Sequence, residues 1–197
     1  MKIIFISGPT GSGKTTLSQK LSKEFINSTI LSTDDYYKTG LISKLLSRLV
    51  RNYFDKSISF NYKLLFRDLT FICKNNKITH KYKYNFKKKT IKKFLFKKNN
   101  VELIIVEGIF VNDFIRKFNI KNLFFIEINI DKKSCMKRAI KRDMEERGKS
   151  HKFAENDFLN SWNIFYRKRQ NPNINKFIYS SNTEISSLFN KIINYKT

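Results

Sequence analysis

The sequence predicts a three-layer α/β fold in which helices flank a mostly parallel central sheet of about five strands. Residues 3–6 form a short apolar, β-branched run that leads through a glycine-rich loop into a helical pattern. Residues 101–107 and 123–129 are near-continuous apolar runs, as expected for strands buried on both faces of a parallel sheet. The 197 residues, of which 41% are hydrophobic, are enough for one domain with a substantial core.

The loop after the first strand has the pattern of a phosphate-binding loop, because residues 8–15 read G-P-T-G-S-G-K-T and fit G-x-x-x-x-G-K-S/T. Its glycines let successive backbone N–H groups point inward, toward the positive end of the next helix dipole. Lys14 would reach the β- and γ-phosphates of a triphosphate, and the Thr15 hydroxyl would bind Mg²⁺. An ordinary glycine turn is the alternative, but the strand–loop–helix context favours a nucleotide site. Its expected residues are Gly8, Pro9, Thr10, Gly11, Ser12, Gly13, Lys14, Thr15 and Thr16.

A second strand is expected over residues 29–32, and two carboxylates, Asp34 and Asp35, follow it directly. The carboxyl ends of strands are where α/β sheets hold ligands. Asp34 could accept a proton from an attacking hydroxyl or contact the metal through water, and its ordinary alternative is to cap a helix. Beside a phosphate site we favour catalysis for Asp34, and less so for Asp35.

The middle of the chain predicts two helices and an exposed hairpin. Residues 40–70 carry two apolar stripes at helical spacing. Residues 77–98 are the most basic stretch, and apolar or aromatic side chains alternate with polar ones from Ile78 to Phe86. Aromatic side chains between lysines could stack on the bases of a nucleic acid. The hairpin could instead close over a small substrate, or simply be solvated.

The third strand ends at Glu107, where a carboxylate would face the Mg²⁺ beside the phosphate-binding loop. A helix is expected from residue 131, and it continues into an arginine-rich stretch at 138–149. Such charge runs are usually solvated helix faces. In phosphoryl transfer, however, a mobile basic segment neutralises the transition state. A last strand at 177–179 and a closing helix at 183–193 complete the fold.

The net charge of +24 suggests an anionic partner such as nucleic acid. Lysine is enriched throughout, including in the expected strands and helices, so we attribute the charge to compositional bias and do not favour nucleic acid as a partner. The two cysteines, Cys73 and Cys135, have no metal or redox spacing. The first apolar run is too short for a signal peptide, and no apolar stretch approaches a membrane span. We therefore expect a cytoplasmic protein without a membrane partner. The sequence is compatible with a homo-oligomer.

Five stretches resemble, in order, those of the uridine kinase (uridine–cytidine kinase) family of P-loop kinases, over nearly the whole chain. They are residues 8–16, 30–37, 52–60, 84–86 and 106–108, and a sixth, 138–149, is similar to the family's lid. The resemblance implies one kinase domain over 1–197, with an acceptor arm at 50–92 and a lid segment at 138–157. It implies transfer of the γ-phosphoryl group of Mg·ATP to the 5′-hydroxyl of uridine or cytidine, in pyrimidine salvage.

The resemblance also implies a role for each matching residue. Asp34 would be the base that takes the proton, Asp55 would bind the ribose hydroxyls, and Tyr84 would pack near the nucleobase. Thr15 and Glu107 would hold Mg²⁺. The cations that would clamp the phosphates are Lys14, Arg142, Arg147 and Lys149.

The residues expected to read the nucleobase depart from the family. Lys89 stands where the family has histidine, Asp157 where it has glutamine, and Ala139 where it has an arginine, with Arg138 adjacent. Lys149 replaces an arginine, which loses bidentate geometry but keeps the charge. Residues 34–38 and 162–170 also resemble nicotinamide riboside kinases. The alternatives are therefore a kinase for another ribosyl nucleoside, a kinase-like ATP-binding protein without an acceptor, and a nucleic-acid-binding P-loop ATPase.

Overall fold

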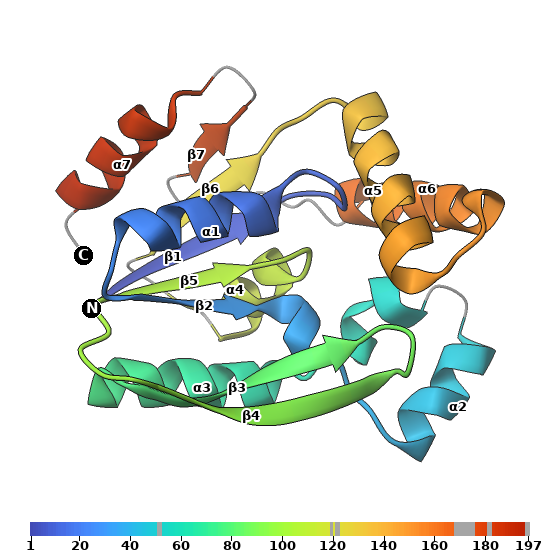
Figure 1. Ribbon diagram of the computed structural model, residues 1–197, viewed down its shortest axis with the longest axis horizontal. Coiled ribbons are helices and arrows are strands. Elements are labelled where there is room, and N and C mark those ends of the chain that lie inside the picture. The colour runs from blue at the N-terminus through green and yellow to red at the C-terminus, as the bar shows by residue number, and fades with distance from the viewer. Residues whose placement is uncertain (51–52, 119, 121–122, 168–175, 181–182, 196–197) are drawn as a thin grey trace.

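The computed structural model describes residues 1–50, 53–118, 120, 123–167, 176–180 and 183–195, without the side chains of residues 55, 57 and 176. Within these ranges, a central sheet of five strands is parallel throughout, in the order β2-β5-β1-β6-β7 (Figure 1). The predicted sheet is thereby confirmed. Its strands are β1 (Lys2–Ser7), β2 (Ser28–Ser32), β5 (Leu103–Glu107), β6 (Phe124–Ile128) and β7 (Lys176–Tyr179).

The strand register brings the functional loops to one edge of the sheet. Glu107, the last residue of β5, is level with Ile6 of β1 on one side and with Ser32 of β2 on the other. The phosphate-binding loop and the 3₁₀ helix η1 (Thr33–Tyr36) therefore begin next to the Glu107 carboxylate. Parallel strands produce this arrangement because their carboxyl ends meet at the same edge.

Alternating side chains of the strands build a separate core on each face of the sheet. Ile4 and Ile6 of β1 pack with the helices α1 (Lys14–Glu24) and α7 (Ile185–Asn194), which cover one face (Figure 1). Phe5, between them in sequence, packs with α3 (Tyr62–Asn75) and α4 (Val111–Phe118) on the other face. The period of two along a strand sends neighbours to opposite faces, which gives the three layers.

The predicted hairpin consists of β3 (Ile78–Asn85) and β4 (Thr90–Lys98), which pair antiparallel in a sheet of their own. It is not exposed on both faces as predicted, because Ile78 and Tyr84 are buried in the core. Before it lie α2 (Leu41–Leu49) and the short 3₁₀ helices η2 (Tyr53–Asp55) and η3 (Ser57–Ser59). The apolar stripe of α2 forms a helix as predicted, but it does not become core. Leu41 is 85% exposed and Leu49 73% exposed, because no element covers that face in the described part of the chain.

Two packed helices follow β6, and they lie beyond the carboxyl ends of the strands in Figure 1. They are α5 (Lys132–Arg147) and α6 (His151–Arg167). The Asp131 side chain caps α5 by accepting a hydrogen bond of 2.8 Å from the backbone N–H of Ser134. Gly148 ends α5 in the left-handed conformation with φ of 67°. Among the described residues, no helix is long and apolar enough to cross a membrane.

Candidate active site

The phosphate-binding loop has the backbone geometry that its glycines predict. Gly11 has φ of 76°, and a Cβ placed there would lie 2.1 Å from the carbonyl oxygen of Cys135, so only glycine fits. Gly13, with φ of 90°, precedes Lys14 at the start of α1. The Lys14 ammonium donates to the carbonyl oxygen of Pro9 at 2.8 Å. Burial lowers the pKa of Lys14, although the charges of Glu107 and Asp34 oppose the shift. The loop thus holds a partly buried cation that an anionic ligand would stabilise.

A carboxylate and a hydroxyl meet where the sequence predicts the metal. The Thr15 hydroxyl donates to Oε1 of Glu107 at 3.2 Å, and Glu107 is buried at the end of β5. Burial and then the neighbouring Asp34 charge raise the pKa of Glu107. Oxygen ligands suit Mg²⁺, which binds through one or two carboxylates with phosphates and waters. Within the described residues, no group of three His, Cys, Asp or Glu gathers.

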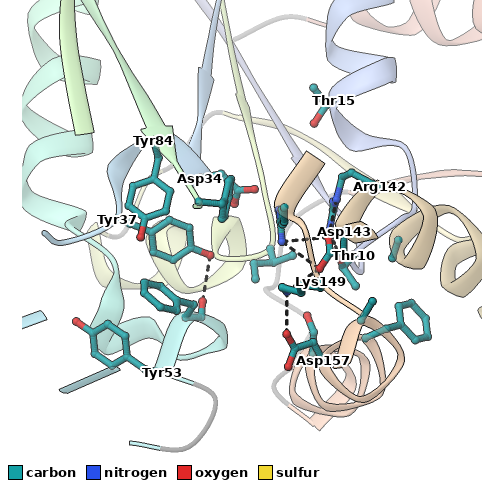
Figure 2. Close-up of a pocket in the computed structure, with 18 of the residues that line it drawn as sticks. Thr10, Thr15, Asp34, Tyr37, Tyr53, Tyr84, Arg142, Asp143, Lys149 and Asp157 are labelled. Carbon is teal, nitrogen blue, oxygen red and sulfur yellow. Dashed lines mark hydrogen bonds and ion pairs between the residues drawn. The ribbon is translucent and has the colours of Figure 1, made fainter. Parts of the chain in front are cut away.

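Asp34 lines the same cavity as Lys14, Thr15 and Glu107, a space of about 400 Å³. It lies in η1, the turn that directly follows β2. The N-cap of that turn is Ser32, so the capping role that the sequence left open for Asp34 does not apply. In Figure 2, the Asp34 carboxylate lies between a wall of tyrosines and a group of charged side chains.

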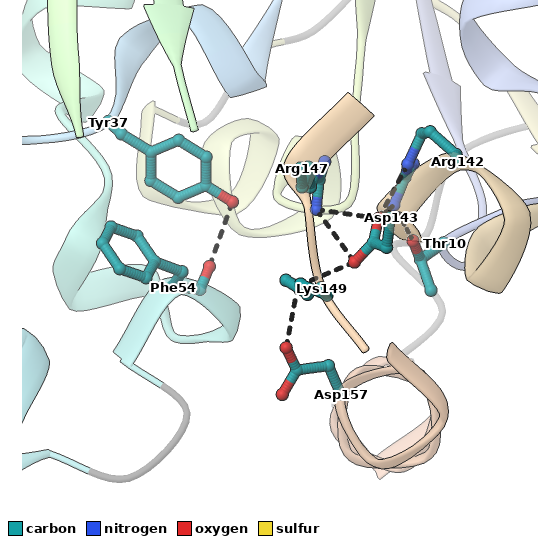
Figure 3. Close-up of polar contacts among 8 residues, drawn as sticks. All are labelled: Thr10, Tyr37, Phe54, Arg142, Asp143, Arg147, Lys149 and Asp157. Atoms are coloured by element: carbon teal, nitrogen blue, oxygen red, sulfur yellow. Dashed lines mark hydrogen bonds and ion pairs between the residues drawn. The ribbon is translucent and has the colours of Figure 1, made fainter. Parts of the chain in front are cut away.

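Aromatic side chains form one wall of the cavity, and they come from the residue after η1, from η2 and from the hairpin. The Tyr37 hydroxyl donates to the carbonyl oxygen of Phe54 at 3.0 Å, and the rings of Tyr37 and Tyr84 lie 5.0 Å apart (Figures 2 and 3). Burial, then the neighbouring Tyr53, raises the pKa of Tyr84 to about 12, so its hydroxyl stays protonated near neutral pH. Lys89 places its ammonium 5.4 Å from the Phe54 ring centre. Tyr37 and Tyr84 are only 4% and 3% exposed, so this wall is a cluster of aromatic side chains packed against one another.

The opposite wall carries the charges of the lid segment, gathered around Asp143 (Figure 3). This carboxylate accepts hydrogen bonds from Nη2 of Arg142 and Nζ of Lys149, both at 2.7 Å, and it pairs with Nη1 of Arg147 at 3.2 Å. Burial alone would raise the pKa of Asp143, but Arg147 and Arg142 hold it below its ordinary value. Asp143 therefore orders three cations in the site.

Two further contacts join the lid segment to its surroundings. Arg142 donates a hydrogen bond of 3.4 Å to the hydroxyl of Thr10, a residue of the phosphate-binding loop. The Arg147 guanidinium lies 3.8 Å from the ring centre of Phe86, a residue of the hairpin. Both arginines are thus positioned at the border between the loop and the aromatic wall.

The structure brings most of the predicted residues together, with some differences. Arg138 is exposed and does not line the cavity, whereas Ala139 does, because one step along α5 rotates a side chain by about 100°. Asp157 lines the cavity but is paired with Lys149 at 2.8 Å. The side chain of Asp55 lies outside the described residues. The predicted residues that do line the cavity are Thr10, Lys14, Thr15, Asp34, Tyr84, Lys89, Glu107, Arg142, Arg147, Lys149 and Asp157.

Sequence reasoning missed Asp143 and the aromatic partners Tyr53, Phe54 and Phe86. The available signal for Asp143 was its position directly after Arg142 inside the basic stretch, although Glu145 and Glu146 follow it before Arg147. The three aromatic residues lie in the stretches 52–60 and 84–86 that resemble the kinase family, but aromatic side chains are frequent throughout the chain at 15%, so their type did not mark them as site residues.

The chain is similar to known kinases in sequence and in fold. The profile described as the Phosphoribulokinase / Uridine kinase family matches residues 3–179. A uridine kinase from Clostridium novyi is 34% identical over 152 residues, which cover 75% of this chain and 71% of that protein. A uridine kinase from Borrelia hermsii is 29% identical over 87% of this chain and 82% of that protein. D-glycerate 3-kinase from Cryptococcus neoformans has a similar fold, with a TM-score of 0.63 at 14% identity over 91% of this chain and 86% of that one.

Proposed function

The chain belongs to the phosphoribulokinase and uridine kinase family, and on this premise we propose that it transfers the γ-phosphoryl group of ATP to the 5′-hydroxyl of a nucleoside. Uridine and cytidine are the first candidate acceptors, because relatives at about a third identity carry the name uridine kinase. A cytoplasmic role in pyrimidine salvage follows from that choice of acceptor. The arm at 50–92 and the lid segment at 138–157 would close over it.

One observation carries the proposal: the Asp34 carboxylate shares a cavity with the phosphate-binding loop and its Lys14. A sugar hydroxyl bound there loses its proton to Asp34 as its oxygen attacks the γ-phosphorus. The new oxygen–phosphorus bond forms while the bond to the β-phosphate oxygen breaks, and ADP leaves. Lys14 and the cations of the lid segment stabilise the negative charge that spreads over the transferred group.

The residues that would hold Mg²⁺ are Thr15 and Glu107, whose hydroxyl and carboxylate oxygens are 3.2 Å apart. When bound, the ion neutralises charge on the β- and γ-phosphate oxygens. The raised pKa of Glu107 supports this assignment, because a buried carboxylate with another negative charge nearby would be stabilised by a cation.

The acceptor would lie between the aromatic wall and the lid segment. Tyr84 would pack near the nucleobase, and Asp55 would bind the ribose hydroxyls. Lys89 and Asp157 line this space with charges where the family has histidine and glutamine. A site that hydrogen-bonds a nucleobase discriminates strongly, so these two residues set the identity of the base. Nicotinamide riboside is the alternative acceptor.

The test is a coupled ADP-release assay with uridine, cytidine and nicotinamide riboside, in which mass spectrometry identifies the product as a 5′-monophosphate. We expect turnover with at least one nucleoside. Asp34→Asn should lower kcat on the order of 10²- to 10⁴-fold, as expected for loss of a general base. Binding of a non-hydrolysable ATP analogue should persist.

Three outcomes would contradict the proposal, and the first two would each favour another function. Binding of the ATP analogue without binding of any nucleoside would indicate a kinase-like protein that lacks an acceptor. ATPase activity stimulated by RNA or DNA, and weakened steeply by salt, would indicate a nucleic-acid-dependent ATPase. Full activity of Asp34→Asn would exclude Asp34 as the base.

A further inference from the structure

Two neighbouring aspartates in η1 take different directions. Asp34 lines the cavity, whereas Asp35 does not. Oδ1 of Asp35 instead accepts a hydrogen bond of 3.0 Å from the backbone N–H of Tyr84, in strand β3 of the hairpin. The Asp35 side chain is only 19% exposed, so water competes little for this bond.

We propose that Asp35 is a positioning residue, which holds Tyr84 of the hairpin in place against the turn that carries Asp34. The inference rests on the proposed function, since Asp34 is there the base and Tyr84 a wall of the acceptor site. Asp35 would set the distance between the reacting hydroxyl and the surface near which the nucleobase packs.

The hairpin needs contacts that hold it against the rest of the domain, because it is not part of the central sheet. Strands β3 and β4 pair only with each other in the described residues. The last residue pair before the hairpin turn is Asn85 with Thr90, and Tyr84 with Ile91 is the pair next to it. A two-stranded hairpin is marginally stable by itself, so its free end is held by contacts with the rest of the domain.

Ring contacts and a hydrogen bond hold the hairpin against the turn around η1 in different ways. Tyr84 is buried, and its ring centre lies 5.0 Å from that of Tyr37 and 6.4 Å from that of Phe54, which are contacts of side chains and not of the backbone. A hydrogen bond to one backbone N–H is directional and specifies one residue. Side chains alternate between faces along a strand, so a slip of one residue would turn Tyr84 away from the cavity.

In this proposal, Asp35 holds the hairpin through its hydrogen bond to the Tyr84 N–H and not through an ion pair. The nearest cation to Asp35 is the Lys83 ammonium at 3.8 Å, and that side chain is 75% exposed. Exposed ion pairs contribute little, whereas a carboxylate that accepts from a backbone N–H makes a charge-assisted bond. Lys83 therefore provides a matched control for the role of Asp35.

The experiment compares Asp35→Ala, Asp35→Asn and Lys83→Ala with the unmodified protein. Its first readout is hydrogen exchange of the Tyr84 amide, followed by NMR, which needs no activity. Its second is the KM of the nucleoside against the KM of ATP and kcat. Thermal unfolding of each variant verifies that it is folded.

We expect Asp35→Ala to lose protection of the Tyr84 amide and to raise the nucleoside KM about 10- to 100-fold, the range for one hydrogen bond to a charged group. The ATP KM should change less than about 3-fold, since the phosphate-binding loop is untouched. Asp35→Asn should rescue both readouts, because its amide oxygen still accepts the hydrogen bond. Lys83→Ala should leave both unchanged.

The proposal is overturned if the Tyr84 amide stays protected in Asp35→Ala, if Asp35→Asn is as impaired as Asp35→Ala, or if both KM values rise together. Failure of the proposed function looks different. If the unmodified protein phosphorylates no nucleoside, that function is wrong, and exchange of the Tyr84 amide still decides whether Asp35 holds the hairpin.

Discussion

The buried carboxylate of Asp143 offers the sharpest test of the electrostatics of this site. Asp143→Asn keeps the shape of the side chain but removes its charge from among Arg142, Arg147 and Lys149. The three cations then repel one another around a neutral amide. We therefore expect a loss of stability, confined to conditions under which the wild-type carboxyl is ionised.

The size of the expected loss in the free energy of unfolding depends on how deeply Asp143 and its three cations are buried. Removing one partner of a buried ion pair costs about 3–5 kcal/mol. The Asp143 side chain is 7% exposed, but the three cations are 32%, 17% and 29% exposed, so solvent recovers part of that cost. We expect the free energy of unfolding to fall by about 2–3 kcal/mol at pH 7. For a chain of this size the melting temperature would fall by about 5–10 °C.

The stabilisation by Asp143 should decrease as the pH falls. The folded protein holds the pKa of Asp143 below its ordinary value of 3.8, so the unfolded chain binds the proton more readily. Stabilisation by Asp143 is therefore complete above that ordinary pKa and is lost as the pH falls through the lowered one. The difference between wild type and variant should be full at pH 6–7 and should shrink below about pH 3.8.

Urea unfolding at a series of pH values measures this difference directly. Glu145→Gln is the matched control on the same helix, because Glu145 pairs at 3.9 Å with Lys141 and both side chains are well exposed. It should change stability by less than about 0.5 kcal/mol. A loss in Asp143→Asn below about 0.5 kcal/mol at pH 7, or an equal loss at pH 3, would refute the reasoning.

Two further substitutions probe the loops at the sheet edge. Lys14→Ala should lower kcat on the order of 10²- to 10³-fold, as for loss of one oxyanion-stabilising donor, with little change in melting temperature; unaltered turnover in the ADP-release assay would remove Lys14 from the mechanism. Gly108→Ala places a Cβ 1.7 Å from Oγ1 of Thr33 at φ of 148°, so it should displace the turn that carries Asp34. We expect a loss on the order of 2 kcal/mol or more in urea unfolding together with reduced kcat, and a variant of normal stability and activity would contradict this.

The phosphate-binding loop and the sheet were predictable because their signals are local. Glycines at fixed offsets before Lys14 specify one backbone path, and apolar runs of β-branched residues specify buried strands. The hairpin was predictable for the same reason, from alternation along residues 78–86. Neighbouring residues in the chain are also neighbours in space within each of these elements, so no distant partner had to be known.

Predictions were weaker where a helix face had to be assigned. The stripe of α2 predicted a helix correctly, yet Leu41 and Leu49 remain exposed, because periodicity does not say what lies opposite. Arg138 looked equivalent to the missing arginine at Ala139, but α5 turns it to solvent. Choosing between adjacent helix positions requires knowing which side of α5 meets α6.

The sequence by itself determined the strand–loop–helix that would hold phosphate, the order of the strands along the chain, and the presence of carboxylates and cations suited to phosphoryl transfer. The sequence favoured Asp34 over Asp35 for the site, but only the tertiary structure showed that Asp35 binds the hairpin instead, and that three cations share one carboxylate at Asp143. The reason is physical. The direction of Asp35 depends on a backbone N–H 49 residues away in sequence, and such partners come together only when the sheet, the hairpin and the lid segment pack.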